Sequence, residues 1–272
     1  MIEYSIIPII TYGCESWNPN KTETKSVNSL LDNIIKRILM TPQSTPREAL
    51  YIETGLLDPE TIGLKQKVMM DYRLTNNPNP RLHKMATAEE PNLWKKLAEH
   101  AKGLLEITDR DTQGKKPSVK NNVKAKTAKY FKKKITQDGQ EKSKIKFLLE
   151  GRTEWKPHFK QKYLAELTRL NACTIFHART RMIDIKNNFR NKYPDITCRA
   201  CGKDEETQEH VLETCQTLHK NPSNLVTKID IFEETTSALQ VTAQKIRNTL
   251  EKLKDCTARA DAMSPHVIRG ST

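Results

Sequence analysis

The sequence has little of the material that builds a large hydrophobic core. Only 36% of its 272 residues are hydrophobic and 6% are aromatic, whereas 29% are charged. The mean hydropathy is −0.70. With so few apolar side chains, the chain is expected to form small helical units rather than one compact globule.

Long apolar runs are also missing. The most apolar stretch, residues 6–10, is too short to span a bilayer, so no membrane partner is expected. The start of the chain, residues 1–13, has no basic segment, and Glu3 and Pro8 interrupt its apolar residues, which argues against a secretory signal. Pro8 leaves an edge strand and a broken helix both open. Because this buried-looking run starts abruptly, residues 1–17 are interpreted as the tail of a larger core.

Cysteine is too sparse for a secreted disulfide framework. The chain has six cysteines, and Cys14, Cys173 and Cys256 stand alone in the sequence. Isolated cysteines in a chain of this length are most simply reduced thiols. We therefore expect an intracellular protein, in the nucleus or the cytoplasm.

The other three cysteines belong to one short segment. Cys198, Cys201, His210 and Cys215 follow the spacing C-x2-C-x8-H-x4-C, which can close a tetrahedron around one zinc ion. Gly202 suits a tight turn whose amides point at the sulfurs, and a short helix is expected to end near Cys215. Four unrelated reduced side chains or a disulfide are the alternatives, but the complete Cys/His set favours zinc.

Positive charge is concentrated elsewhere. The formal net charge is +13 and the pI is about 9.4, which favours a polyanionic partner. Residues 115–146 alone carry +10, because twelve lysines stand against Asp138 and Glu141. These lysines are Lys115, Lys116, Lys120, Lys124, Lys126, Lys129, Lys132, Lys133, Lys134, Lys142, Lys144 and Lys146.

Within this segment, two aromatic residues lie among the lysines. Tyr130 and Phe131 are flanked by Lys129 and by Lys132, Lys133 and Lys134. Such a mixture is typical of a surface that contacts phosphates and stacks a base. A solvated helix face with two anchoring aromatics explains the same pattern equally well.

A second basic set precedes the zinc motif. The last helix of a predicted helical region, residues 142–189, would carry Arg179, Lys186 and Arg190 on one face, with Arg181 nearby. Its apolar face would consist of Ala178, Met182, Ile185 and Phe189. A basic stripe leading into a zinc module favours nucleic-acid binding, although these arginines can also pair with the acidic residues of the zinc motif.

Start and stop signals predict several helices before residue 107. An amphipathic helix with Leu31 and Ile35 on its apolar face ends at Pro42. The segment 45–48 has the pattern of a capping box, and Gly55 supplies a helix stop. Asp58 and the proline after it are expected to cap the next helix.

The predicted fold class is mainly α, a string of small helical units with a short C-terminal zinc-binding module. The expected parts are residues 1–17, the tail of a missing core; 18–107, a thumb-like helical region; 108–146, a lysine-rich linker or helix; 147–218, a helical region with the zinc module; and 219–272, a C-terminal helix and frayed tail. The clearest boundary follows residue 107, where polar residues include Gly114 and Pro117.

Two stretches resemble one protein family. TYGCESW, followed by SLLDNIIKRILM and TPREALYIETGLL, resembles the region just after the polymerase core of non-LTR retrotransposon reverse transcriptases, where the chain passes into the thumb. ARTRMIDIKNNFRNKYPDITCRACGKDEETQEHVLETC resembles their C-terminal arginine-bearing helix and CCHC zinc motif. The two matches cover residues 4–75 and 175–215, in the order and at about the distance found in that family.

The resemblance implies thumb-like helices along a template–primer duplex and a zinc region that grips RNA or target DNA. It also implies carboxylates that hold two metal ions, typically in a Y-x-D-D hairpin, but this sequence has no Asp-Asp pair. No catalytic residue is assigned, and the chain by itself is not expected to be an enzyme. Its further partners would be the polymerase and endonuclease domains of the parent element.

Two alternatives to nucleic-acid binding are compatible with the sequence. The first is a zinc-stabilised protein-interaction module, whose acidic residues 204–213 meet a basic protein surface. The second is a transposon remnant without a function of its own.

Overall fold

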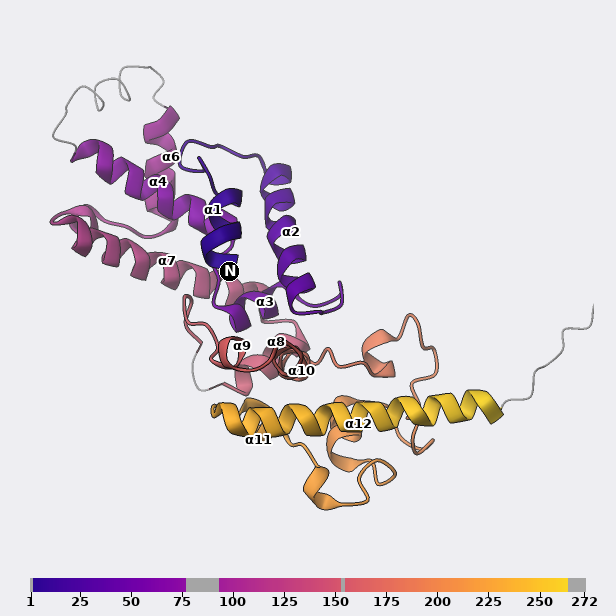
Figure 1. Ribbon diagram of the computed structural model, residues 1–272. Helices are drawn as coiled ribbons and strands as arrows, with labels where there is room; N and C mark the ends of the chain where they lie inside the picture. Colours follow the sequence, from indigo (N-terminus) through magenta and orange to yellow (C-terminus); the bar gives the residue numbers. More distant parts are fainter. Residues whose placement is uncertain (1, 77–92, 153–154, 264–272) are drawn as a thin grey trace, which may run out of the picture. The chain divides into compact units, whose positions relative to one another are not determined.

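The computed structural model describes residues 2–76, 93–152 and 155–263, and it is mainly α-helical, as the sequence predicts (Figure 1). Those three ranges contain no β-strand, only an isolated antiparallel bridge between Thr197 and Glu205. None of the helices within them has the length and apolar content needed to cross a membrane. The chain forms two compact units. The first comprises Met1–Ile38, Pro46–Lys146 and Glu154–Lys160, and the second Leu39–Thr45, Phe147–Thr153 and Gln161–Thr272.

The first unit begins with a short helical segment. The helices of this unit are η1 (Ile2–Ile6), α1 (Ile7–Ile10), α2 (Lys21–Ile38), α3 (Arg47–Thr54), α4 (Pro59–Thr75), α6 (Leu93–Leu104), η2 (Asp109–Thr112) and α7 (Lys116–Gly139). The opening run is therefore a helix and not a strand. The expectation that it is buried is wrong, since Ile9 is 76% exposed and Tyr12 is 92% exposed. A single turn of α-helix can bury only the face that packs on its neighbours, so isoleucines on its other side stay exposed.

Helix starts and stops explain the next three helices. Leu31 and Ile35 of α2 are fully buried, as their spacing predicts. Gly55 ends α3 in the left-handed region, with φ of 67°. The Asp58 side chain caps α4 by accepting a hydrogen bond of 2.8 Å from the Thr61 amide. These three predictions are confirmed.

The predicted capping box at the start of α3 is wrong. No side chain caps this helix. The Thr45 hydroxyl lies 2.6 Å from the Thr41 hydroxyl instead, and the buried Glu48 carboxylate accepts a hydrogen bond of 2.8 Å from the Lys142 ammonium. Both capping side chains therefore have other partners.

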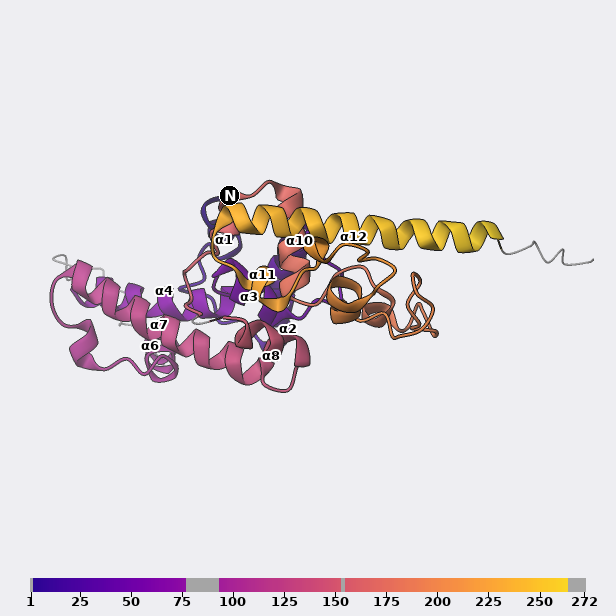
Figure 2. The ribbon, with the colours of Figure 1, turned by 90° about the horizontal axis from the view of Figure 1, so that it is seen from below.

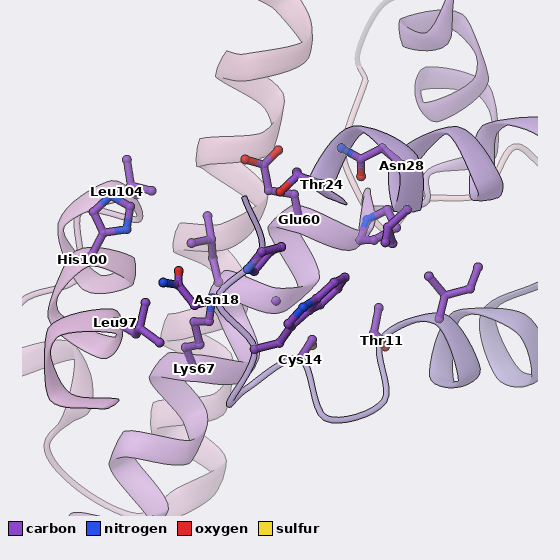
Figure 3. A pocket seen from close by; sticks show the side chains of 17 residues that line it. Thr11, Cys14, Asn18, Thr24, Asn28, Glu60, Lys67, Leu97, His100 and Leu104 are labelled. Atoms are coloured by element: carbon purple, nitrogen blue, oxygen red, sulfur yellow. The ribbon is translucent and has the colours of Figure 1, made fainter. Parts of the chain in front are cut away.

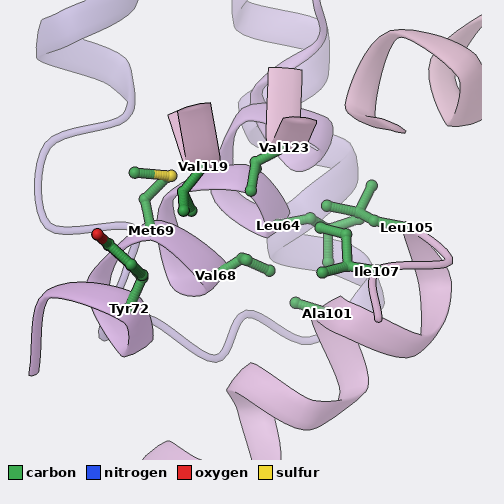
Figure 4. Close-up of a cluster of buried hydrophobic side chains, with 9 residues drawn as sticks. All are labelled: Leu64, Val68, Met69, Tyr72, Ala101, Leu105, Ile107, Val119 and Val123. Atoms are coloured by element: carbon green, nitrogen blue, oxygen red, sulfur yellow. The ribbon is translucent and has the colours of Figure 1, made fainter. Parts of the chain in front are cut away.

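The core next to α4 unites three helices. Figure 4 shows this cluster, to which α4, α6 and α7 all contribute. It consists of Leu64, Val68, Met69, Tyr72, Ala101, Leu105, Ile107, Val119 and Val123. Because Val119 and Val123 follow the polar segment 108–118, that segment, which includes η2 and the first residues of α7, lies inside the first unit and does not separate two cores.

Helix α7 buries one residue in every four. Its buried positions are Val119, Val123, Thr127, Phe131, Ile135 and Gly139. Residues four apart lie one above the other on a helix, in a row that winds slowly around the axis. The lysine-rich segment is therefore a packed helix and not a linker.

The second unit contains shorter helices and one long one. Helix α8 (Ser143–Glu150) leads into it, and its elements are α9 (Tyr163–Glu166), α10 (Arg169–Arg179), η3 (Lys186–Phe189), η4 (His210–Thr214), η5 (Pro222–Asn224), α11 (Lys228–Phe232) and α12 (Thr236–Met263). Helix α12 packs against α9, α10, α11 and η4, and Figure 2 shows it crossing α10. The predicted C-terminal helix is present and continues through Met263, beyond the expected start of fraying at residue 257. Residues 264–272 lie outside the described ranges.

Helix α10 is shorter than predicted and ends at Arg179. The Met182 amide donates to the His177 carbonyl at 2.7 Å, and Arg181 adopts a left-handed conformation with φ of 53°. This pattern is a Schellman motif, which closes a helix by satisfying its last carbonyl groups. The sequence has no glycine or proline at this point, so the prediction from apolar periodicity placed the end of the helix too late.

Candidate metal centre and basic surfaces

The four predicted metal ligands come together in the second unit. The ligand atoms of Cys198, Cys201, His210 and Cys215 all lie within 4.8 Å of one another. The sulfurs of Cys198 and Cys215 are 4.0 Å apart, and the Cys201 sulfur lies 3.3 Å from His210 Nε2. Zinc bonds to sulfur and nitrogen of about 2.0–2.3 Å place such atoms roughly 3.5–3.8 Å apart in a tetrahedron. The cluster could therefore hold a metal ion.

Backbone amides surround the sulfurs, as the tight turn predicted. Gly202 has φ of 65°, and its amide donates to the Cys198 carbonyl at 2.9 Å. Burial raises the pKa of the Cys198 thiol to about 12, even though the amides of Ala200 and Cys201 point at it. Burial also acts on Cys201, but the amides of residues 203 and 204 and the His210 ring outweigh it and lower the pKa to about 6. A cation is needed to hold all three sulfurs as thiolates.

A wide helical turn brings His210 and Cys215, five residues apart, to the same side of the chain. Residues His210–Thr214 form a π-helical turn, in which the Cys215 amide donates to the His210 carbonyl at 2.8 Å. An α-helix would rotate Cys215 away from His210, whereas the wider turn brings both ligands to one side. Cys215 lies just after the turn, as predicted.

Side chains around the cluster fix its orientation. His210 Nδ1 lies 3.2 Å from the Thr214 hydroxyl, which leaves Nε2 directed at the cysteines. The fully buried Glu206 carboxylate accepts hydrogen bonds from the Lys186 backbone amide at 2.7 Å and from the Arg199 guanidinium at 2.6 Å. Such outer contacts hold metal ligands in place.

The second unit does not assemble the predicted arginine stripe. Arg179 ends α10, whereas Lys186 lies in η3 and Arg190 follows it, so they do not share one helix face. Arg181 pairs with Glu209, and Lys186 lies 3.0 Å from Asp195. Arg190 is exposed and 3.9 Å from Glu205. The alternative pairing of arginines with acidic residues of the zinc motif accounts for Arg181 and Arg190.

Arg179 is a structural residue. It is only 4% exposed, and its guanidinium lies over the rings of Tyr163 and Phe232, at 4.7 and 5.4 Å. It also donates to the carbonyls of Ile231 at 2.9 Å and Glu233 at 3.0 Å, at the end of α11. A side chain enclosed in this way holds α10 to α11 and offers no charge to a ligand.

We predict that Arg179→Gln destabilises the second unit by about 3 kcal/mol, because two charge-assisted hydrogen bonds and two ring contacts are lost. Arg190→Gln, at an exposed position, should change stability by less than about 0.5 kcal/mol. Urea unfolding followed by far-UV circular dichroism compares the two. Equal midpoints would show that Arg179 does not hold these helices together.

In the first unit, the predicted aromatic contacts are not available for stacking on a base. Phe131 is fully buried against Tyr51, with ring centroids 5.7 Å apart, and Tyr130 packs on the core of α4, α6 and α7. Lys134 lies 2.9 Å from Asp58, and Lys129 lies 3.0 Å from Glu106. Of the four lysines that flank these aromatics, only Lys132 and Lys133 are exposed without an ion pair among the described residues.

Sequence reasoning counted the lysines of residues 115–146 but did not recognise a regular basic surface on α7, which we call the lysine row. It consists of Lys116, Lys120, Lys124 and Lys132, which are all exposed. Lys120, Lys124 and Lys132 each follow a buried residue by one position, and Lys116 lies four residues before Lys120. No ion pair to any of them occurs among the described residues. Burial, and then repulsion by Lys124 and Lys120, lower the pKa of Lys65 on α4. The four-residue spacing of Lys116, Lys120 and Lys124 was the available signal.

Comparison with known protein families, with curated proteins and with solved structures finds no match to this chain.

Proposed function

We propose that this chain binds nucleic acid as the C-terminal part of a non-LTR retrotransposon reverse transcriptase, without catalysing polymerisation itself. The resemblance of residues 4–75 and 175–215 supports the family, and the lysine row supports the binding. In this proposal RNA or DNA lies along α7, and the protein acts inside the cell. The polymerase and endonuclease domains of the parent element would supply the chemistry.

The lysine row is the main support for this proposal, because the repulsion between its charges destabilises α7 unless an anionic partner neutralises them. Like charges four residues apart on a helix destabilise it by about 0.2–0.5 kcal/mol per pair. Lys116 also stands at the positive end of the helix dipole. On the other flank of the buried stripe, Lys126 and Lys134 pair with Asp111 and Asp58, so only one flank carries unneutralised charge. A phosphate backbone would neutralise it.

We further propose that the metal of the cysteine–histidine cluster is zinc and that its role is structural. Three thiolates and one imidazole complete a closed tetrahedral set, which is typical of structural zinc and leaves no position for a substrate. The ion would fix the chain that follows α10. The buried Glu206 weakens the alternative of an acidic docking surface, because the carboxylate is already enclosed by this chain.

The test is a titration of labelled single-stranded RNA, single-stranded DNA and duplex DNA at several salt concentrations. Lys120→Gln, Lys124→Gln and Lys132→Gln together should weaken binding about tenfold or more at low salt. They should also reduce the slope of log affinity against log salt by roughly 2–3, since each lost phosphate contact removes about 0.7–0.9.

The matched control changes the same number of charges on the second unit. Lys203, Lys220 and Lys252 are exposed there, and their replacement by glutamine lowers the net charge equally. If both triple variants lose the same affinity, net charge and not the lysine row binds the nucleic acid. An affinity that hardly changes between low and physiological salt would reject the proposal.

A further inference from the structure

A cavity in the first unit is lined by neither the four metal ligands nor the lysine row. It lies among α1, α2, α4 and α6 and has a volume of about 160 Å³ (Figure 3). Apolar side chains such as Val27, Leu64 and Leu97 form much of its wall. A dry cavity of about 150 Å³ can hold a benzene ring, so this one has room for a single aromatic ring.

Lys67 of α4 lines the cavity and lacks a counter-charge. It is 9% exposed, and no carboxylate of the described residues forms an ion pair with its ammonium. Burial lowers its pKa. The group whose charge acts on this pKa is the Cys14 thiol, which burial and the adjacent Glu15 keep neutral by raising its own pKa to about 11. A buried cation without a partner is unfavourable, so the site lacks an anion.

Asn28 of α2 lines the side of the cavity opposite Lys67 in Figure 3. No group of the described residues donates a hydrogen bond to its side-chain oxygen. Asn28 is 8% exposed, and its Oδ1 is buried with no partner. A buried carbonyl oxygen left unpaired costs about 1–3 kcal/mol. The site therefore also lacks an N–H or O–H group.

The other polar groups with contacts in the cavity wall are already engaged. The Thr11 and Thr24 hydroxyls donate to the carbonyls of Ile7 and Asn20, and the Cys14 thiol donates to Gln66. Glu60 pairs with Lys134 at 2.6 Å. Lys67 and Asn28 are thus the two buried polar side chains of this wall that a ligand can satisfy.

We propose that this cavity binds a small aromatic carboxylate that carries a hydrogen-bond donor on the side of its ring opposite the carboxylate. The carboxylate pairs with the Lys67 ammonium, the ring fills the apolar space, and the donor reaches Asn28 Oδ1. The lysine row takes no part in this site, so the inference stands independently of nucleic-acid binding.

Three probes separate these contacts on the unmodified protein by calorimetry and ligand-observed NMR. 4-Hydroxyphenylacetate offers both polar groups, phenylacetate lacks the donor, and 2-(4-hydroxyphenyl)ethanol lacks the carboxylate. The first should bind best. Loss of the carboxylate should weaken binding about tenfold or more, and loss of the hydroxyl about two- to tenfold.

Variants assign each contact to its residue. Lys67→Met should weaken 4-hydroxyphenylacetate binding about tenfold or more, whereas Asn28→Leu should remove the difference between 4-hydroxyphenylacetate and phenylacetate. Lys65→Met, two residues away and outside the cavity wall, is the matched control and should leave binding unchanged. Tryptophan fluorescence melts establish that each variant is folded.

Two results would overturn the proposal. One is the absence of binding by all three probes at millimolar concentration, which would mean that water alone satisfies Lys67 and Asn28. The other is equal binding of 4-hydroxyphenylacetate to the wild-type protein and to folded Lys67→Met.

Discussion

Removing the metal should unfold the segment around residues 196–218 while the first unit stays folded. Binding of structural zinc is worth about 10–16 kcal/mol in small modules, as much as or more than the whole stability of a typical domain. The described part of this segment has little regular secondary structure, since it contains one isolated bridge and one π-helical turn. We therefore expect the fold of this segment to depend on a bound ion.

Hydrogen exchange measured by mass spectrometry tests this prediction in both units at once. After chelation, peptides from 196–218 should lose protection, whereas peptides from α2 and α4 should keep it. All three tryptophans, Trp17, Trp94 and Trp155, belong to the first unit, so tryptophan fluorescence should not change. Protection of residues 198–215 without metal would contradict the prediction.

Ligand variants should have the same effect as chelation. Cys201→Ser and His210→Ala each remove one of four ligands and should purify with far less zinc than the wild-type protein, which should hold about one equivalent. Cys256→Ser, in α12, is the matched control and should keep its zinc. A folded wild-type protein with less than about half an equivalent would reject zinc.

The metal cluster was predictable because its geometry is local. Cys198, Cys201, His210 and Cys215 lie within one short segment, and a glycine and the residues between them determine the turns. Nothing distant in the sequence has to be placed before the four ligands meet. The same reason explains why Asp58 and Gly55 were recognised correctly as helix signals.

The basic surfaces were less predictable because their side chains depend on distant neighbours. A lysine count cannot distinguish Lys134, which meets Asp58 from 76 residues away, from the unpaired Lys124. Phe131 looked like an exposed aromatic because the residues beside it are lysines, yet Tyr51 and Trp155 cover it. Arg179 was misassigned for the same reason, since its partners come from α9 and from the end of α11.

Replacing Asp58 should destabilise the first unit more than any other single change of charge described in that unit. Its carboxylate is fully buried and accepts hydrogen bonds of 2.9 Å from both Arg47 and Lys134, in addition to the Thr61 amide. One side chain thus connects α3, α4 and α7. Asp58→Ala removes a helix cap worth about 1 kcal/mol and leaves two cations without their shared partner. Removing one member of a buried ion pair costs about 3–5 kcal/mol.

Urea unfolding followed by tryptophan fluorescence measures this loss in the first unit alone. Glu60→Gln is the matched control, because Glu60 contacts the same Lys134 from a side chain that is 41% exposed. It should cost less than about 1 kcal/mol. Lys134→Met added to Asp58→Ala should cost less than the sum of the two single changes, since each single change already breaks the same ion pair.

The direction in which the stability contributed by Asp58 changes with pH can also be predicted. Burial alone would raise the pKa of Asp58, but Lys134 and Arg47 outweigh it, so that the pKa in the folded state lies below the ordinary value of 3.8. The unfolded chain therefore takes up a proton first as the pH falls. The stability that ionised Asp58 contributes is complete well above pH 3.8 and is lost below it. The difference between wild type and Asp58→Ala should accordingly be constant at neutral pH and shrink in acid. A difference that grows as the pH falls would show that Asp58 is not held as a carboxylate by its two cations.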